Sequence, residues 1–116
     1  EYEGRTIRIG QCNNSFIFPG VGLGVLATGA RRVTNEMFVA AARVLAEFSP
    51  ALKEKDAPLY PRLENVREVS RQVAIAVGLE AQRAGLSEET TRAELERRVE
   101  SRMWRPSYVP FKRRMV

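Results

Sequence analysis

The feature that most constrains this chain is residues 11–24, QCNNSFIFPGVGLG, where polar, apolar and small residues follow one another in blocks. Two adjacent amides, Asn13 and Asn14, lead into a short apolar run at 15–18, and Pro19 follows. The length and Phe/Ile content of the run predict a buried strand, which the proline would end because it lacks an N–H donor. Asparagine amides both donate and accept hydrogen bonds, so the pair could orient a carboxylate or an amide at the edge of that strand.

A dinucleotide-like motif follows at once, since residues 22–27 read G-x-G-x-x-A. In a nucleotide-binding fold this motif forms the turn between a strand and a helix, and an acid-ended second strand follows about 20 residues later. Here Pro19 and Gly20 separate the motif from the expected strand, and residues 43–47 have a helical pattern. We therefore interpret 20–30 as a helix of small residues that packs closely against another backbone and ends at Gly29.

Apolar residues at helical spacing predict three further helices, at 34–48, 63–84 and 87–103. Thr34 is the expected N-cap of the first, and Gly85 is expected to end the second. Ser87 is expected to open the third through an imperfect capping box, with Leu95 and Val99 as its few apolar anchors. Residues 49–62 form a proline-containing loop.

The expected fold is mainly α, with about four helices and one or two short strands. Residues 15–18 would form one strand and the alternating residues 6–9 the other. The tail 104–116 has no clear periodicity, and its basic cluster at 112–114 is expected to fray. Such a chain would expose the apolar surface of the strand and the glycine-rich helix, so we expect either homo-oligomers that cover this surface or some rearrangement of residues 1–20.

The composition of the chain limits the kinds of site that it can form. The net charge is +5, from 19 Lys and Arg against 14 Asp and Glu. Most basic residues alternate with Glu, as in 88–102, which favours a solvated helix face with local ion pairs. A basic helical binding module that uses 92–105 is the alternative, and its affinity for phosphates would fall steeply with salt. The chain has no His and a single Cys12, which excludes a His-based site and an internal disulfide. We expect Cys12 to be a small buried hydrophobe.

The order of these segments resembles a known family. QCNNSFIFPGVGLG, ATGARRVTNEMFVAAARVLA and APLYPRLENVREVSRQVAIAVG, continued to Trp104 and Tyr108, closely resemble the C-terminal part of malic enzymes. The resemblance covers nearly the whole chain, and the start at Glu1 without Met agrees with a fragment. It implies that residues 1–116 are the C-terminal portion of an α/β, Rossmann-type NAD-binding domain together with a C-terminal helical segment.

The resemblance implies an oxidoreductase that converts (S)-malate to pyruvate and CO₂ with NAD or NADP and Mg or Mn. Malolactic enzymes, which release lactate, share the pattern. In the family the catalytic Tyr and Lys, the substrate Arg and the metal-binding acids lie upstream, so no catalytic or metal-binding residue is assigned here and the chain alone should be inactive. Malate and the dinucleotide would be the partners of the parent enzyme. We do not expect a nucleic acid or a membrane as a partner. We expect the protein to be cytoplasmic.

Two site residues are implied by the resemblance. Asn14 would hydrogen-bond the substrate carboxylate, and Asn13 would lie near the substrate and nicotinamide pocket. The alternative is that both amides are turn formers that satisfy the local backbone.

Overall fold

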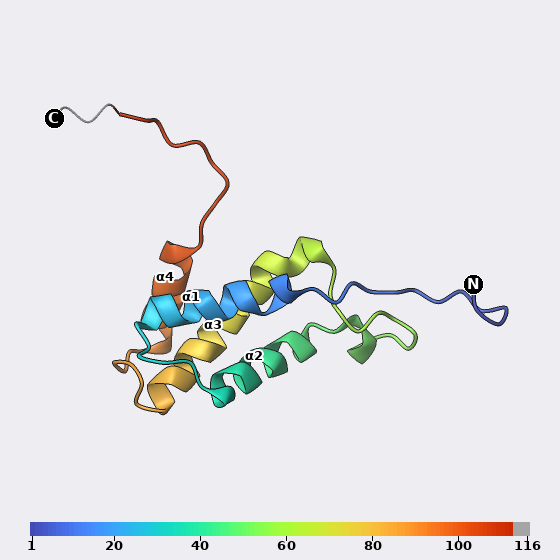
Figure 1. The fold of residues 1–116 in the computed structure, drawn as a ribbon, viewed down its shortest axis with the longest axis horizontal. Helices are drawn as coiled ribbons and strands as arrows, with labels where there is room; N and C mark the ends of the chain where they lie inside the picture. Colours follow the sequence, from blue (N-terminus) through green and yellow to red (C-terminus); the bar gives the residue numbers. More distant parts are fainter. Residues whose placement is uncertain (113–116) are drawn as a thin grey trace.

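The computed structural model describes residues 1–112 and contains four α-helices in that range. The longest, α3 (Val66–Arg83), lies at the centre of the body and contacts all three others (Figure 1). The first residues of the chain and residues 105–112, in contrast, extend away from this body (Figure 1). The other helices are α1 (Phe18–Thr28), α2 (Asn35–Glu47) and α4 (Arg92–Arg102), with short 3₁₀ turns η1 (Asn14–Phe16), η2 (Pro50–Leu52) and η3 (Leu63–Asn65).

The core forms around α3 because that helix is apolar on two sides. Its stripe of Val69, Val73, Val77 and Ala81 is spaced four residues apart and fully buried. This stripe packs with η1, α1 and α2, and the cluster includes Phe16 of η1 and Met37 and Ala41 of α2. The other side carries Ala74 and Ile75, which pack in a second cluster with Ala27, Leu95 and Val99.

Helix α1 approaches α3 through glycines, as the sequence predicts. A Cβ at Gly24 would lie 2.7 Å from the Ala74 carbonyl oxygen and 3.0 Å from Val77 Cγ1. A Cβ at Gly20 would lie 2.9 Å from the Ser70 carbonyl oxygen, so the two helix backbones approach closely at both glycines. The G-x-G-x-x-A motif lies inside α1 rather than in a strand-to-helix turn, which confirms its interpretation as a packing motif.

The two expected strands are absent from residues 1–112. Residues 6–9 are unpaired, and the β-pairing in this part of the chain is an isolated bridge between Tyr2 and Arg5. Residues 15–18 form η1 and the first residue of α1. Pro19 lies at the start of α1, where its missing N–H would have no intrahelical partner. A strand also needs a partner strand, so this apolar run becomes helical instead.

The prediction for the start of α4 is also wrong. Its N-cap is Thr91, whose Oγ1 accepts a hydrogen bond from Glu94 N at 3.2 Å. Ser87 lies in the connection after α3, where the Leu86 carbonyl accepts from Arg31 N at 3.0 Å. Thr90 in turn accepts a 2.8 Å bond from the Gln82 side chain. These contacts hold the connection against the body, so the helix begins only after it.

Other helix ends agree with the sequence. Thr34 caps α2 by accepting from Met37 N, and Gly29 and Gly85 adopt positive φ values of 66° and 70° beyond α1 and α3. Helix α3 begins at Val66, preceded by η3, slightly later than expected. None of the helices in the described part of the chain is long and apolar enough to span a membrane. The expected fraying of 112–114 concerns residues that lie, except for Lys112, outside the described range.

Candidate functional site

The Asn13–Asn14 pair forms the turn that leads into η1 and α1. Asn13 has an extended backbone, and its Oδ1 accepts from Ser15 N at 2.9 Å and from Ser15 Oγ at 2.8 Å. The Asn13 carbonyl also accepts from Phe16 N at 3.2 Å. The side-chain oxygen of Asn13 therefore caps η1, and the turn-forming role describes this residue well.

Asn14 has a different environment. Its carbonyl accepts from Ile17 N at 3.0 Å, but its exposed side-chain amide has no hydrogen-bond partner within residues 1–112. The two amides therefore differ chemically: the oxygen of Asn13 is committed to the backbone, whereas the whole amide of Asn14 can meet a ligand.

A buried aromatic side chain anchors this turn. Phe16 is fully buried, and its ring centroid lies 6.1 Å from that of Tyr60, in the loop before α3. The nearby Cys12 side chain raises the pKa of Tyr60, first through a hydrogen-bonding contribution and then through its charge. Cys12 itself is exposed, which corrects the expectation of a buried cysteine. The turn is thus anchored by the buried ring of Phe16, which lies against Tyr60.

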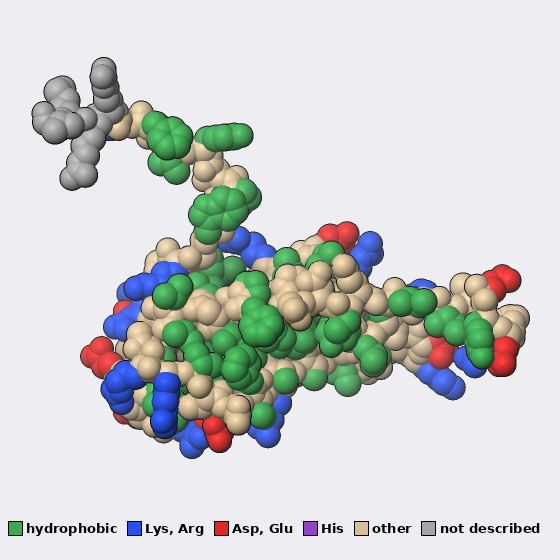
Figure 2. Space-filling model, in the orientation of Figure 1, with side chains coloured by type: hydrophobic (Ala, Val, Ile, Leu, Met, Phe, Trp, Pro, Cys, Tyr) green, Lys and Arg blue, Asp and Glu red, His purple; other side chains and the backbone are tan. Residues whose placement is uncertain are grey.

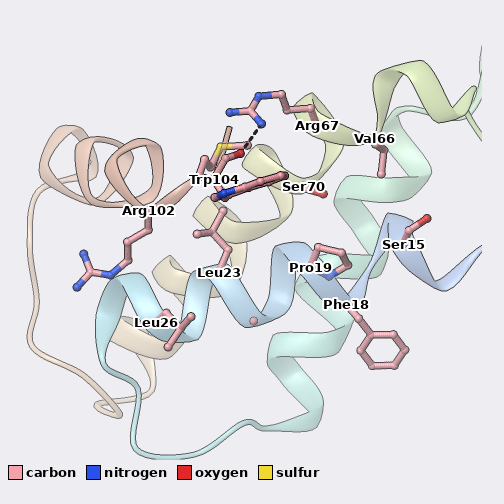
Figure 3. A pocket seen from close by; sticks show the side chains of 12 residues that line it. Ser15, Phe18, Pro19, Leu23, Leu26, Val66, Arg67, Ser70, Arg102 and Trp104 are labelled. Atoms are coloured by element: carbon pink, nitrogen blue, oxygen red, sulfur yellow. Dashed lines mark hydrogen bonds between the residues drawn. The ribbon is translucent and has the colours of Figure 1, made fainter. Parts of the chain in front are cut away.

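An apolar groove begins at the same turn. It runs along α1 between the start of α3 and the end of α4, has a volume of about 560 Å³, and has Ser15 at one end (Figure 3). Phe18, Leu26 and Trp104 line it and are 57%, 68% and 76% exposed. Figure 2 shows hydrophobic side chains gathered over the helices on the face in view. Arg67 closes the far side by donating to the Trp104 carbonyl at 3.0 Å (Figure 3).

The groove was not predicted as a site. Its signal in the sequence is that α1 is apolar on nearly all sides, whereas the body buries only one of them. That imbalance indicates a surface that can take an apolar group, with a polar turn at one end. This combination is common in ligand sites.

The arginine-rich face of α4 is internally paired. Arg98 and Arg97 both contact Glu94, and the hydrogen bond from Arg98 together with the charge of Arg97 lowers the pKa of that carboxyl. Arg71 of α3 contacts Glu100 at 2.9 Å. The interleaving of Arg and Glu therefore produces the local ion pairs that the sequence predicts.

The site can be tested for fit to a metal and a dinucleotide. Among residues 1–112, no group of three or more Asp, Glu, Cys or His side chains could hold a metal ion. The backbone of 22–27 is helical, so its N–H groups are not arranged as a phosphate-binding turn. The residues that this chain could offer a ligand are instead the two amides and the apolar groove beside them.

The sequence model of the family "Malic enzyme, NAD binding domain" matches residues 1–82. The NAD-dependent malic enzyme of Pseudomonas syringae pv. syringae (strain B728a) is 47% identical over 116 residues, covering 100% of this chain and 21% of that protein. The NAD-dependent malic enzyme of Proteus mirabilis (strain HI4320) is 47% identical over 112 residues, covering 97% and 20%. The crystal structure of the Entamoeba histolytica malic enzyme matches with a TM-score of 0.69 and 28% identity, over 84% of this chain and 20% of that one.

The family model and the curated relatives agree on one class, the malic enzymes. The chain belongs to the malic enzyme family, and the resemblance seen in the sequence is confirmed. It spans about one fifth of the length of the curated relatives.

Proposed function

We propose that this chain is the C-terminal portion of the NAD-binding domain, with a helical segment behind it, of an enzyme that oxidises and decarboxylates (S)-malate to pyruvate and CO₂. NAD or NADP would accept the hydride, and Mg or Mn would bind to residues outside this chain. Family membership and the resemblance of the QCNNSFIFPGVGLG stretch to malic enzymes support this proposal. The chain alone would be inactive, because in malic enzymes the catalytic Tyr and Lys and the metal-binding acids lie upstream of this segment.

Within that enzyme, Asn14 would bind the substrate carboxylate. The observation that carries this role is the exposed side-chain amide of Asn14, which has no partner within the described residues, on a turn that is anchored by a buried ring. An amide N–H can donate to a carboxylate oxygen without adding charge to the pocket. Asn13 would lie beside it, near the substrate and the nicotinamide.

The test uses the full-length product of the gene that encodes this chain. Malate turnover is followed with NAD and with NADP, in the presence of Mn, for the unmodified protein and for Asn14→Ala. A hydrogen bond to a charged group contributes about 1.5–3 kcal/mol, so the KM for malate should rise about 10- to 150-fold. Ser107→Ala, in the exposed tail, serves as a control and should leave the KM unchanged.

The products separate the alternatives. Pyruvate with reduced dinucleotide supports the malic enzyme, whereas lactate without net reduction of the dinucleotide identifies a malolactic enzyme. If the gene product turns over no malate and instead binds polyanions with a steep salt dependence, the basic binding module replaces the enzyme proposal.

A further inference from the structure

The hydrogen bonds of the turn define what Asn13 can recognise. Backbone N–H groups only donate, so the Asn13 atom that lies 2.9 Å from Ser15 N must be its oxygen. This chemistry fixes the orientation of the amide. The Ser15 hydroxyl donates to the same oxygen at 2.8 Å, which gives Oδ1 two donors.

The consequence concerns the other end of the amide. Oδ1 accepts both of these hydrogen bonds. If the amide were rotated by 180°, its NH₂ group would lie opposite the Ser15 N–H and hydroxyl, and the Ser15 N–H would lose its acceptor. The Asn13 Nδ2 has no hydrogen-bond partner among residues 1–112, and the residue is only half-buried. Asn13 can therefore present two N–H donors, and no acceptor, to a neighbouring ligand.

Ser15 is placed to enforce this state. Its side chain lines the end of the apolar groove (Figure 3), while its hydroxyl is turned to Asn13. Phe16, directly after it, is fully buried and fixes the backbone of Ser15, whose N–H and hydroxyl make the two bonds.

We propose that Ser15 is a positioning residue that locks Asn13 as a donor-only group, so that Asn13 binds an oxygen acceptor of the ligand. The inference rests on the proposed function, which brings substrate and nicotinamide to this turn. Two groups share the required chemistry: a carboxylate oxygen of the dicarboxylate substrate and the carbonyl oxygen of the nicotinamide carboxamide. Asn13 would therefore only donate hydrogen bonds to the ligand, whereas the amide of Asn14 could donate or accept them.

The decisive variant is Asn13→Asp in the full-length gene product. Aspartate is as good an N-cap as asparagine, so its second oxygen keeps the bonds to Ser15 while the N–H donors are lost. Because aspartate also adds a negative charge beside an anionic ligand, Asn13→Ser is measured with it: serine is an equally good N-cap, adds no charge and lacks the amide N–H donors. A purely structural role predicts an unchanged melting temperature and unchanged kinetics for Asn13→Ser. The proposal predicts an unchanged melting temperature with a KM that rises about tenfold or more. A rise for malate assigns the acceptor to the substrate carboxylate, and a rise for the dinucleotide assigns it to the carboxamide.

A second pair tests Ser15 independently. Ser15→Ala should raise the same KM about three- to tenfold, because Asn13 loses one of the two bonds that orient it. Ser15→Thr retains the hydroxyl and should restore most of the affinity, whereas Ser107→Ala should have no effect. If Asn13→Asp and Ser15→Ala both leave the KM values within twofold while Asn14→Ala raises that for malate, the inference is wrong and the proposed function stands. If Asn14→Ala also has no effect, or the unmodified protein does not turn over malate, the proposed function fails and this inference fails with it.

Discussion

Two glycines of α1 have opposite environments although they are two positions apart. A Cβ at Gly24 would meet the Ala74 carbonyl oxygen at 2.7 Å, whereas nothing lies within 4 Å of a Cβ at Gly22. We expect Gly24→Ala to lower the free energy of unfolding of the chain by about 1–3 kcal/mol through overpacking. Gly22→Ala should raise it by about 0.5–1 kcal/mol, because alanine loses less backbone entropy in a helix. Urea denaturation of the two variants followed by circular dichroism measures both effects.

The two variants control for each other, since they make the same chemical change in the same helix. Equal losses of stability in both would show that glycine content alone matters and that the close approach to α3 does not.

Individual residues of the site were only partly predictable. The family resemblance points to both asparagines, but the turn assigns them different roles: Asn13 Oδ1 is bound by Ser15, and the Asn14 side chain is exposed. The expectation for Cys12 is wrong because the burial of a small side chain depends on what lies over it. Cys12 is instead exposed, and it lies close enough to Tyr60, a residue far away in the sequence, to raise the pKa of that side chain.

At the scale of elements, the start of α4 allows a second paired prediction. Thr91 Oγ1 accepts from Glu94 N, so Thr91→Ala should lower the free energy of unfolding by about 1 kcal/mol. Ser87, the expected cap, has a buried Oγ with no hydrogen-bond partner among the described residues. Ser87→Ala should therefore leave stability unchanged or raise it, because it removes an unsatisfied polar group.

Thermal unfolding monitored at 222 nm distinguishes the two positions of the cap. A larger loss for Ser87→Ala than for Thr91→Ala would mean that α4 begins at the position favoured by the sequence.

The failure at residues 15–18 has a related cause. An apolar run of this length is compatible with either a buried strand or a helix. The choice depends on the neighbours: Phe16 is buried against α2 and α3, and no strand among residues 1–112 is available to pair with the run. The composition of a short apolar segment therefore indicates that it is buried but not its backbone conformation.

At the scale of the whole molecule, the groove along α1 leaves apolar side chains in contact with solvent, among them Phe18, Leu26 and Trp104. We expect the purified chain to self-associate through this face as its concentration rises. Leu26→Lys should weaken the association at least tenfold, because a desolvated ammonium costs more than about 1.4 kcal/mol. Sedimentation velocity over a range of concentrations measures it.

Ile9→Lys is the matched control, since Ile9 is 90% exposed and lies in the N-terminal arm outside the groove. A chain that stays monomeric at all concentrations, or one that responds equally to both substitutions, would contradict the prediction.

The sequence by itself determined the features that depend on neighbours along the chain. Apolar periodicity located the four helices, and Thr34, Gly29 and Gly85 marked helix ends, because caps and left-handed residues act within one turn. The resemblance carried by QCNN and the segments after it indicated the family. Tertiary structure alone decided that residues 15–18 are helical, that α4 begins after Thr91, that Cys12 is exposed, and that a groove starts at Ser15. Each of these depends on contacts between residues far apart in the chain, whose free energies exceed the small local preferences that a sequence pattern reports.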